Sequence, residues 1–265
     1  MSSDDEQICS DFDGGGHIGF DPRREFVKLI RNYAPVDELR ILFSSIVSVH
    51  DAPEDEPYLH VAAKACNLNA IRFLFARNCA FNSVDQYGFT ALETCVLHSK
   101  VTPFMLLLNF PYRSLAAHKR IFVCALFLSL ENRRFFMFRE LVRTGIININ
   151  AVYERGPIIC CVPPSEPEYL KVLLDVGADV NVRDTSKLTP LMIACRDPDG
   201  YEAAKMIIDS GADVNAVSSE RFLEDCRSVL HYAVLSNNLN TVKVCSLFFL
   251  YIFKTLICFF FHTFD

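Results

Sequence analysis

The stretches VLLDVGADVN at residues 172–181 and MIIDSGADVN at residues 206–215 are almost the same sequence. Each has an apolar run typical of a helix, then a glycine that can end the helix in a left-handed conformation, then a short extended piece. Thr189-Pro190-Leu191-Met192 lies upstream of the second stretch. Two near-identical stretches with the same order of elements indicate an internal repeat.

A period of 33 residues extends this repeat over most of the chain. Steps of 33 residues back from Thr189 meet the start of a similar short helix at Gly156-Pro157-Ile158-Ile159, Val123-Cys124-Ala125-Leu126, Thr90-Ala91-Leu92-Glu93 and Pro57-Tyr58-Leu59-His60. A further step reaches Arg24, and the next copy forward, at Ser228, follows after 39 residues. A single helix-turn-helix unit cannot bury its apolar face alone, so we expect the units to stack into one continuous core.

These features resemble the ankyrin repeat, which pairs a β-turn with two antiparallel helices and carries a T-P-L-H-x-A signature. The matching residues are Leu59-His60-Val61-Ala62-Ala63, Thr189-Pro190-Leu191-Met192-Ile193-Ala194 and Leu230-His231-Tyr232-Ala233, together with both GADVN segments. The match is weaker near residues 90 and 123, where FPYRSL replaces GADVN and TGIININ carries one extra residue. The resemblance covers roughly residues 22–245 and implies an all-α ankyrin-repeat solenoid of helix-turn-helix units with β-turn fingers.

The domain organisation follows from the repeat. We expect a disordered acidic arm at 1–21, because these residues hold six acids and no Lys or Arg. The array then occupies 22–245, and a Phe-rich tail occupies 246–265. The predicted units lie near 22–55, 56–88, 89–121, 122–154, 155–187 and 188–226, with an incomplete unit at 227–245.

Charge and cysteine content exclude several classes of function. Outside the acidic arm the chain is neutral, so it lacks the basic surface that binds nucleic acid. The eleven cysteines are scattered, none forms a C-x-x-C pair, and no secretory signal opens the chain. Reduced thiols in the cytoplasm, or in the nucleus, are therefore expected.

The chain shows no pattern of an enzyme. Gly14-Gly15-Gly16 lies in the acidic arm and is not a phosphate loop, and the G-K-[ST], H-E-x-x-H and G-x-S-x-G motifs are absent. Cys160 and Cys161 are adjacent, so they do not converge on one metal ion. By resemblance, His60 and His231 make structural hydrogen bonds. We expect no catalytic residues, no cofactor and no metal site.

The resemblance implies a monomeric protein-interaction scaffold or adaptor, whose partner is another protein. Ankyrin proteins bind partners with the finger-like turns and with the concave face of the first helices. The candidate contacts on two fingers are Asp85, Gln86, Tyr87, Arg183, Asp184, Thr185, Ser186 and Lys187. The insert VSSERFLEDCR at 217–227 is a longer finger, whose candidate contacts are Arg221, Phe222 and Leu223.

Three departures from the repeat pattern are of interest. Lys187 replaces the usual turn glycine, which predicts a left-handed backbone there. Pro163 and Pro164 shorten the first helix of the copy at 155–187 to about one turn, and thereby suggest a notch that receives a partner. Asn181 and Asn215 end the GADVN segments and, by resemblance, are candidates for hydroxylation.

The repeat pattern fails after Cys245, where LFFLYIFKTLICFFFHTFD carries only Lys254 and Asp265 as charges. We favour a truncated or mis-predicted end, because T-rich DNA encodes such a composition. A helix docked on the last repeat is a second reading. The third is a membrane-tethered regulator anchored by 247–261, although fifteen helical residues span only ~22 Å of a ~30 Å hydrocarbon core. A truncated end also leaves open a substrate receptor of a ubiquitin-ligase complex, with its recruiting box missing.

Overall fold

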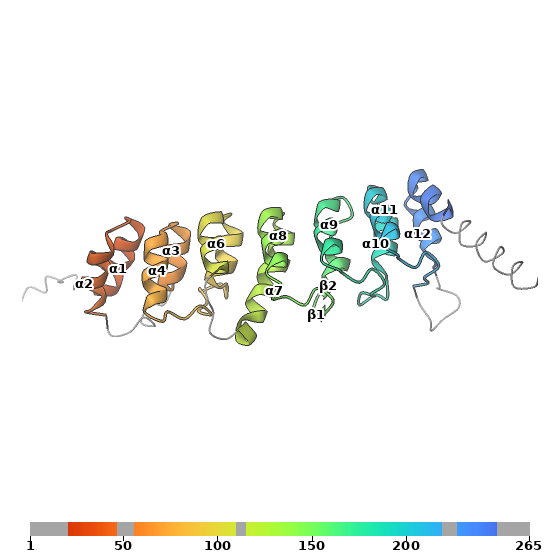
Figure 1. The fold of residues 1–265 in the computed structure, drawn as a ribbon. Helices are drawn as coiled ribbons and strands as arrows, with labels where there is room; N and C mark the ends of the chain where they lie inside the picture. The colour runs from red at the N-terminus through yellow and green to blue at the C-terminus, as the bar shows by residue number, and fades with distance from the viewer. Residues whose placement is uncertain (1–20, 47–55, 110–114, 219–226, 248–265) are drawn as a thin grey trace, which may run out of the picture. The chain divides into compact units, whose positions relative to one another are not determined.

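The computed structural model describes residues 21–46, 56–109, 115–218 and 227–247, which form two compact units, Met1–Gly88 and Phe89–Asp265. The described secondary structure is almost entirely helical, and within each unit the helices form antiparallel pairs (Figure 1). The predicted all-α fold is therefore confirmed, with one short β-hairpin added. Residues 1–20 of the expected acidic arm lie outside the described residues.

The first unit contains two helical pairs, formed by α1 (Pro22–Arg31), α2 (Val36–Phe43), α3 (Tyr58–Lys64) and α4 (Leu68–Ala76). Asp21 begins α1, because its carboxylate accepts the backbone N–H of Arg23 at 3.0 Å. Aromatic rings fill the core: those of Phe26 and Tyr58 meet edge to face, with 4.9 Å between ring centroids. The two pairs thus share one apolar core, as the repeat pattern predicts.

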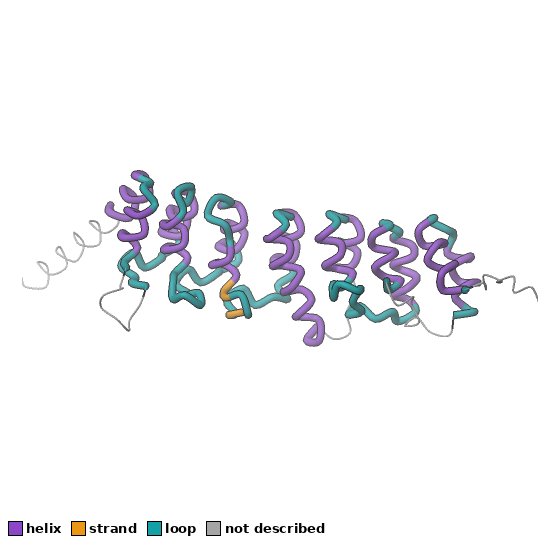
Figure 2. Tube along the Cα trace, turned by 180° about the vertical axis from the view of Figure 1, so that it is seen from behind, coloured by secondary structure: helices purple, strands orange, loops and turns teal. Residues whose placement is uncertain are grey.

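The second unit continues the pattern. Its elements are α5 (Ala91–Leu97), α6 (Val101–Leu108), α7 (Leu115–Glu131), α8 (Phe135–Arg143), β1 (Val152–Tyr153), β2 (Gly156–Pro157), the 3-10 helix η1 (Ile158–Cys161), α9 (Pro167–Asp175), α10 (Pro190–Arg196), α11 (Tyr201–Asp209) and α12 (Val229–Leu235). Residues 239–247 are also helical. First helices contact one another in the pairs α5–α7 and α10–α12, and second helices do so in the pairs α6–α8, α8–α9 and α9–α11. Within each unit the short turns lie at one end of the helices and the longer connections at the other (Figure 2).

The hydroxyl side chains at the signature position cap the helices that follow them. Thr90 and Glu93 form a capping box at the start of α5, and the Thr189 hydroxyl accepts the Met192 N–H at the start of α10. Ser228 and His231 form the corresponding box at α12. A hydroxyl at this position begins each of these helices by satisfying an otherwise unpaired N–H.

Asparagine side chains link successive connections of the second unit. The Asn150 side chain accepts the N–H of Asp179 at 2.8 Å and donates to the carbonyl of Gly177 at 3.2 Å. Asn181 makes the same pair of bonds one repeat later, to Asp213 and Gly211. Asn150 and Asn181, which end two successive segments, therefore each hold the following segment in place.

Two first helices of the second unit differ in length from their neighbours. α7 runs for 17 residues from Leu115, so the unit boundary expected between 121 and 122 falls inside a helix. No Gly or Pro interrupts residues 115–131, and nothing in the sequence therefore stops the helix. In contrast, η1 has only four residues, which confirms the short helix predicted from Pro163 and Pro164.

Candidate functional site in the second unit

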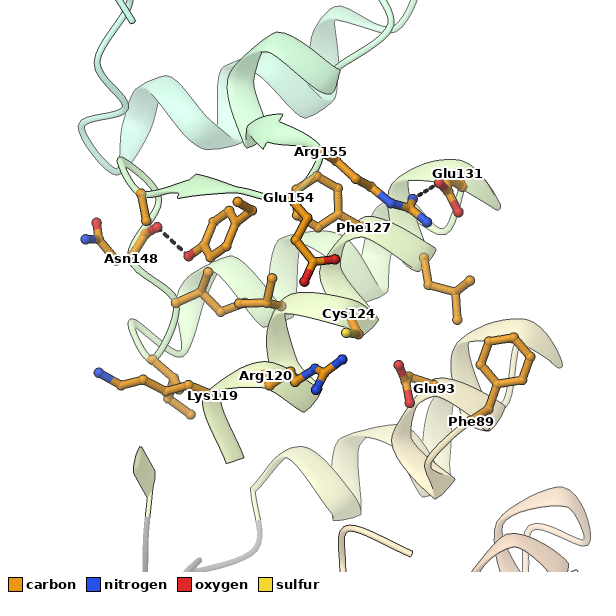
Figure 3. Close-up of a pocket in the computed structure, with 16 residues that line it drawn as sticks. Phe89, Glu93, Lys119, Arg120, Cys124, Phe127, Glu131, Asn148, Glu154 and Arg155 are labelled. Carbon is orange, nitrogen blue, oxygen red and sulfur yellow. Dashed lines mark hydrogen bonds and ion pairs between the residues drawn. The ribbon is translucent and has the colours of Figure 1, made fainter. Parts of the chain in front are cut away.

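A pocket of about 770 Å³ lies between α5, α7 and the segment 146–155, which contains β1 (Figure 3). It combines apolar and charged side chains. Its lining consists of Phe89, Glu93, Lys119, Arg120, Val123, Cys124, Phe127, Leu128, Glu131, Ile146, Ile147, Asn148, Ala151, Tyr153, Glu154 and Arg155. All of these residues belong to the second unit.

One face of α7 supplies nearly half of this lining. Its pocket residues recur at positions 119–120, 123–124, 127–128 and 131, which is the spacing of one helical face. Val123 and Phe127 give this face an apolar centre, while Lys119 and Arg120 lie exposed at its N-terminal end. The length of α7 is thus what provides a continuous wall for the pocket.

The opposite wall is held against α7 by contacts of Tyr153 and Arg155. The Tyr153 ring meets the Phe127 ring edge to face at 5.8 Å, and its hydroxyl donates to the Asn148 carbonyl at 2.7 Å. The Arg155 guanidinium pairs with Glu131 and lies 5.7 Å from the centre of the Phe127 ring. Pairing of Val152 with Pro157 closes the hairpin, and Gly156 supplies the positive φ of 95° at its turn.

The pocket carries both signs of charge around a neutral centre. Figure 3 shows Cys124 between Arg120 and Glu154, with Glu93 at the side of α5. Burial, and then the negative charge of Glu93, raises the pKa of the Cys124 thiol, which therefore stays neutral at physiological pH. An apolar centre with mixed charges at its edge suits a folded or extended segment of protein better than a polyanion.

In the first predicted finger, residues 85–87, one residue shapes the turn and two are exposed to solvent. Asp85 is only 9% exposed, and its carboxylate accepts the Tyr87 N–H at 3.0 Å, so it shapes the turn. Gln86 is exposed, and Tyr87 is 72% exposed. Gln86 and Tyr87 are the residues of this finger that face solvent.

The second finger repeats this division. The Asp184 carboxylate accepts the Leu188 N–H at 2.8 Å, and the Arg183 guanidinium donates to the Lys187 and Val217 carbonyls. Thr185, Ser186 and Lys187 are exposed. Lys187 has a φ of 65°, which confirms the predicted left-handed backbone.

The remaining predicted site residues lie elsewhere. Asn181 and Asn215 are exposed, and the side chain of Asn181 makes the link to the next segment described above. The candidate contacts of the insert, Arg221, Phe222 and Leu223, lie outside the described residues. None of the predicted contact residues lines the pocket. The one feature of the sequence that could have indicated this pocket is the absence of Gly and Pro from residues 115–131, which allows the long helix that forms one of its walls.

His231 and His60 occupy structural positions. The His231 Nδ1 lies 2.7 Å from the Ser228 hydroxyl, within the capping box of α12, and His60 is fully buried. Across the described ranges, no group of three or more His, Cys, Asp and Glu side chains could hold a metal ion. None of the described helices has the length and apolarity that crossing a bilayer requires.

Comparison with known proteins identifies the repeat. Residues 166–246 match the family model of ankyrin repeats in three copies. Residues 166–246 carry ankyrin repeats. Among solved structures, the ankyrin repeat domain of Bcl-3, "a unique member of the IkappaB protein family", superposes with a TM-score of 0.64 at 21% identity, over 84% of this chain and 98% of that one. The human ASB11 ankyrin repeat domain gives 0.57 at 18% identity, over 83% and 96%.

No curated protein sequence matches the chain. At 18–21% identity, the two solved structures establish that this chain has the ankyrin fold. Ankyrin repeats are protein–protein interaction modules, and the fold therefore indicates that the chain binds another protein. The identity of that protein is a separate matter, since fold and target are not tied to each other.

Proposed function

We propose that the chain is a binding scaffold or adaptor that holds a segment of a partner protein in the pocket between α5, α7 and the β1–β2 hairpin. The observation that carries the proposal is the pocket itself, at about 770 Å³. This volume lies within the roughly 300–1,000 Å³ of typical ligand sites and accommodates a few side chains of a partner. The site needs no cofactor and no catalytic group.

The chemistry of the walls indicates what the segment contains. An aliphatic or aromatic side chain would pack on Val123 and Phe127, in the way that anchor residues fill pockets at interfaces. An acidic side chain would face Lys119 and Arg120, and a basic one would face Glu154. The favoured partner is therefore a peptide segment with an apolar anchor flanked by charges of both signs.

The exposed finger residues are proposed as additional contacts. Thr185, Ser186 and Lys187 stand out from a turn that Asp184 and Arg183 hold rigid, so little entropy is lost when a partner binds them. Gln86 and Tyr87 of the first unit are proposed on the same ground. The insert at 217–227 remains a candidate from its sequence.

The compartment, the oligomeric state and the cellular role are proposed from the sequence alone. We expect a monomer in the cytoplasm or the nucleus. A ubiquitin-ligase substrate receptor depends on a recruiting box outside the described residues, and a membrane-tethered regulator depends on 247–261, of which only Leu247 is described. Hydroxylation of Asn181 or Asn215 remains a proposal. For Asn181 the test is the intact mass of peptide 171–187 after exposure to a hydroxylase, and the absence of a gain of about 16 Da would contradict it.

A peptide-display selection on the purified full chain tests the proposed pocket. Selected peptides should lose at least about ten-fold in affinity for Cys124→Trp, because the indole fills the space that the anchor occupies. Val176→Trp, at a residue that is 47% exposed at the end of α9, is the matched control and should bind normally. Equal binding to the two variants would contradict the proposed site.

A further inference from the structure

Two cysteines that are far apart in the sequence lie in contact within the core of the second unit. Cys195 belongs to the last turn of α10, and Cys245 belongs to the helix at 239–247. Their Sγ atoms are 3.6 Å apart, although 50 residues separate them along the chain. Both residues are buried, with exposed fractions of 0% and 4%. Two successive helical pairs are therefore in contact through these sulfur atoms.

The distance between the two sulfur atoms suits the formation of a disulfide. At 3.6 Å the atoms are close to van der Waals contact, and no other group separates them. A disulfide bond is about 2.05 Å long, so its formation requires an approach of roughly 1.5 Å. Small rotations of the two side chains supply a movement of this size.

The hydrogen bond between the thiols makes the two cysteines chemically unequal. This bond lowers the pKa of Cys245, against the opposing effect of burial. It raises the pKa of Cys195, and burial raises that pKa further. Because only a thiolate attacks an oxidant, Cys245 is the residue that reacts first, and Cys195 is placed to attack the product.

We propose that Cys195 and Cys245 form an oxidative modification site, at which a hydroperoxide joins them in a disulfide. The Cys245 thiolate attacks one peroxide oxygen, so that an S–O bond forms, the O–O bond breaks, and the leaving oxygen takes a proton from solvent. The Cys195 sulfur then attacks the sulfenic acid: the S–S bond forms, the S–O bond breaks, and the departing hydroxide takes the Cys195 proton. Two thiols thus lose two electrons, and the hydroperoxide is reduced to an alcohol, or to water, with one further water released.

The burial of the pair determines when the disulfide forms and what it does. Because Cys245 is 4% exposed, the oxidant reaches it when the helix at 239–247 opens locally. The disulfide then closes a loop that contains α11 and α12, and it holds this helix against α10. In a reducing compartment such a bond is transient, so the attachment of the helix follows the supply of oxidant.

Peptide mapping of the full chain after treatment with a small molar excess of hydrogen peroxide tests the pairing. The remaining thiols are blocked with N-ethylmaleimide in guanidinium, and the chain is digested with trypsin. We expect the peptides 188–196 and 244–254 to be joined, about 2 Da below their summed mass, and to separate on reduction. A chain unfolded before the treatment is the control and should give a mixture of pairings. Recovery of both peptides with blocked thiols, with sulfinic acids, or joined to other cysteines would overturn the proposal.

Two variants test the role of each cysteine and the effect of the bond. Cys195→Ala should leave the peroxide-treated Cys245 as a sulfenic acid that dimedone traps, whereas Cys245→Ala should leave Cys195 reduced. A dimedone adduct on Cys195 alone would overturn this order. Hydrogen exchange of 239–247 should slow on oxidation of the unsubstituted chain and stay the same in both variants. Unchanged exchange in the oxidised unsubstituted chain would overturn the claim that the disulfide holds this helix.

Discussion

The side chain of Asn181 accepts a hydrogen bond from the backbone N–H of Asp213, 32 residues further along the chain, at a distance of 2.8 Å. Its amide also approaches the Gly211 carbonyl at 3.5 Å. The bond joins two segments with the same GADVN sequence, and each of them caps the end of a helix. Repeat-to-repeat geometry is therefore fixed at the connections as well as in the apolar core.

This link predicts that Asn181→Ala destabilises the second unit. The loss should be about 0.5–1.5 kcal/mol, the usual net value of one hydrogen bond. Asn215→Ala is the matched control, because its side chain has no hydrogen bond to a described residue, and it should change stability by less than about 0.5 kcal/mol. Urea denaturation followed by circular dichroism measures both, and equal losses would mean that the link contributes nothing.

Lys187→Gly should raise stability. Lys187 has a φ of 65°, and Gly88 fills the corresponding place of the first finger at a φ of 82°. Relief of the left-handed strain contributes about 1–2 kcal/mol, while the greater freedom of glycine in the unfolded chain costs about 0.4–1 kcal/mol. A net gain of roughly 0.5–1 kcal/mol in the same assay is expected, and a net loss would show that the lysine side chain is stabilising.

Leu173→Ala should be far more costly than Leu174→Ala. The side chain of Leu173 is fully buried, while its neighbour Leu174 is only half-buried. Truncation of a fully buried leucine costs about 2–5 kcal/mol, a large part of the ~5–15 kcal/mol that stabilises an ordinary domain. Calorimetric unfolding of the two variants decides the register of α9, and a greater loss for Leu174→Ala would show that the register is wrong.

Cys160 should react slowly with alkylating agents. Burial raises the pKa of this thiol to about 12, with a smaller contribution from the negative charge of Asp184. Only the thiolate is nucleophilic, so little of this thiol is reactive at pH 8, and the rate of alkylation should continue to rise as the pH is raised above the ordinary thiol range. Mass spectrometry after iodoacetamide treatment, with the guanidinium-unfolded chain as control, measures this. A rate at pH 8 equal to that of the unfolded chain would contradict the raised pKa of this half-buried thiol.

The repeat architecture could be predicted because its signals are local and recur. The GADVN turns, the hydroxyl at each helix start and the buried Leu173 follow from residue types at fixed spacing. The left-handed Lys187 could be predicted in the same way, because its turn aligns with one that ends in Gly88.

The pocket could not be predicted in this way, since it depends on contacts between segments that no periodicity connects. The Tyr153 ring on Phe127 and the pair between Arg155 and Glu131 join residues about two dozen positions apart. They form where the β1–β2 hairpin lies against the C-terminal part of α7. The fingers and the concave face of the first helices were the expected contact surfaces, and the structure adds a pocket within the second unit.

The most direct test of the proposed binding site is hydrogen exchange of the full chain with and without the tightest-binding peptide from the selection. We expect slower exchange in the segments 119–131 and 146–155, because the peptide covers α7 and the hairpin that face the pocket. Protection confined to the finger at 183–187, with both of these segments unchanged, would contradict it.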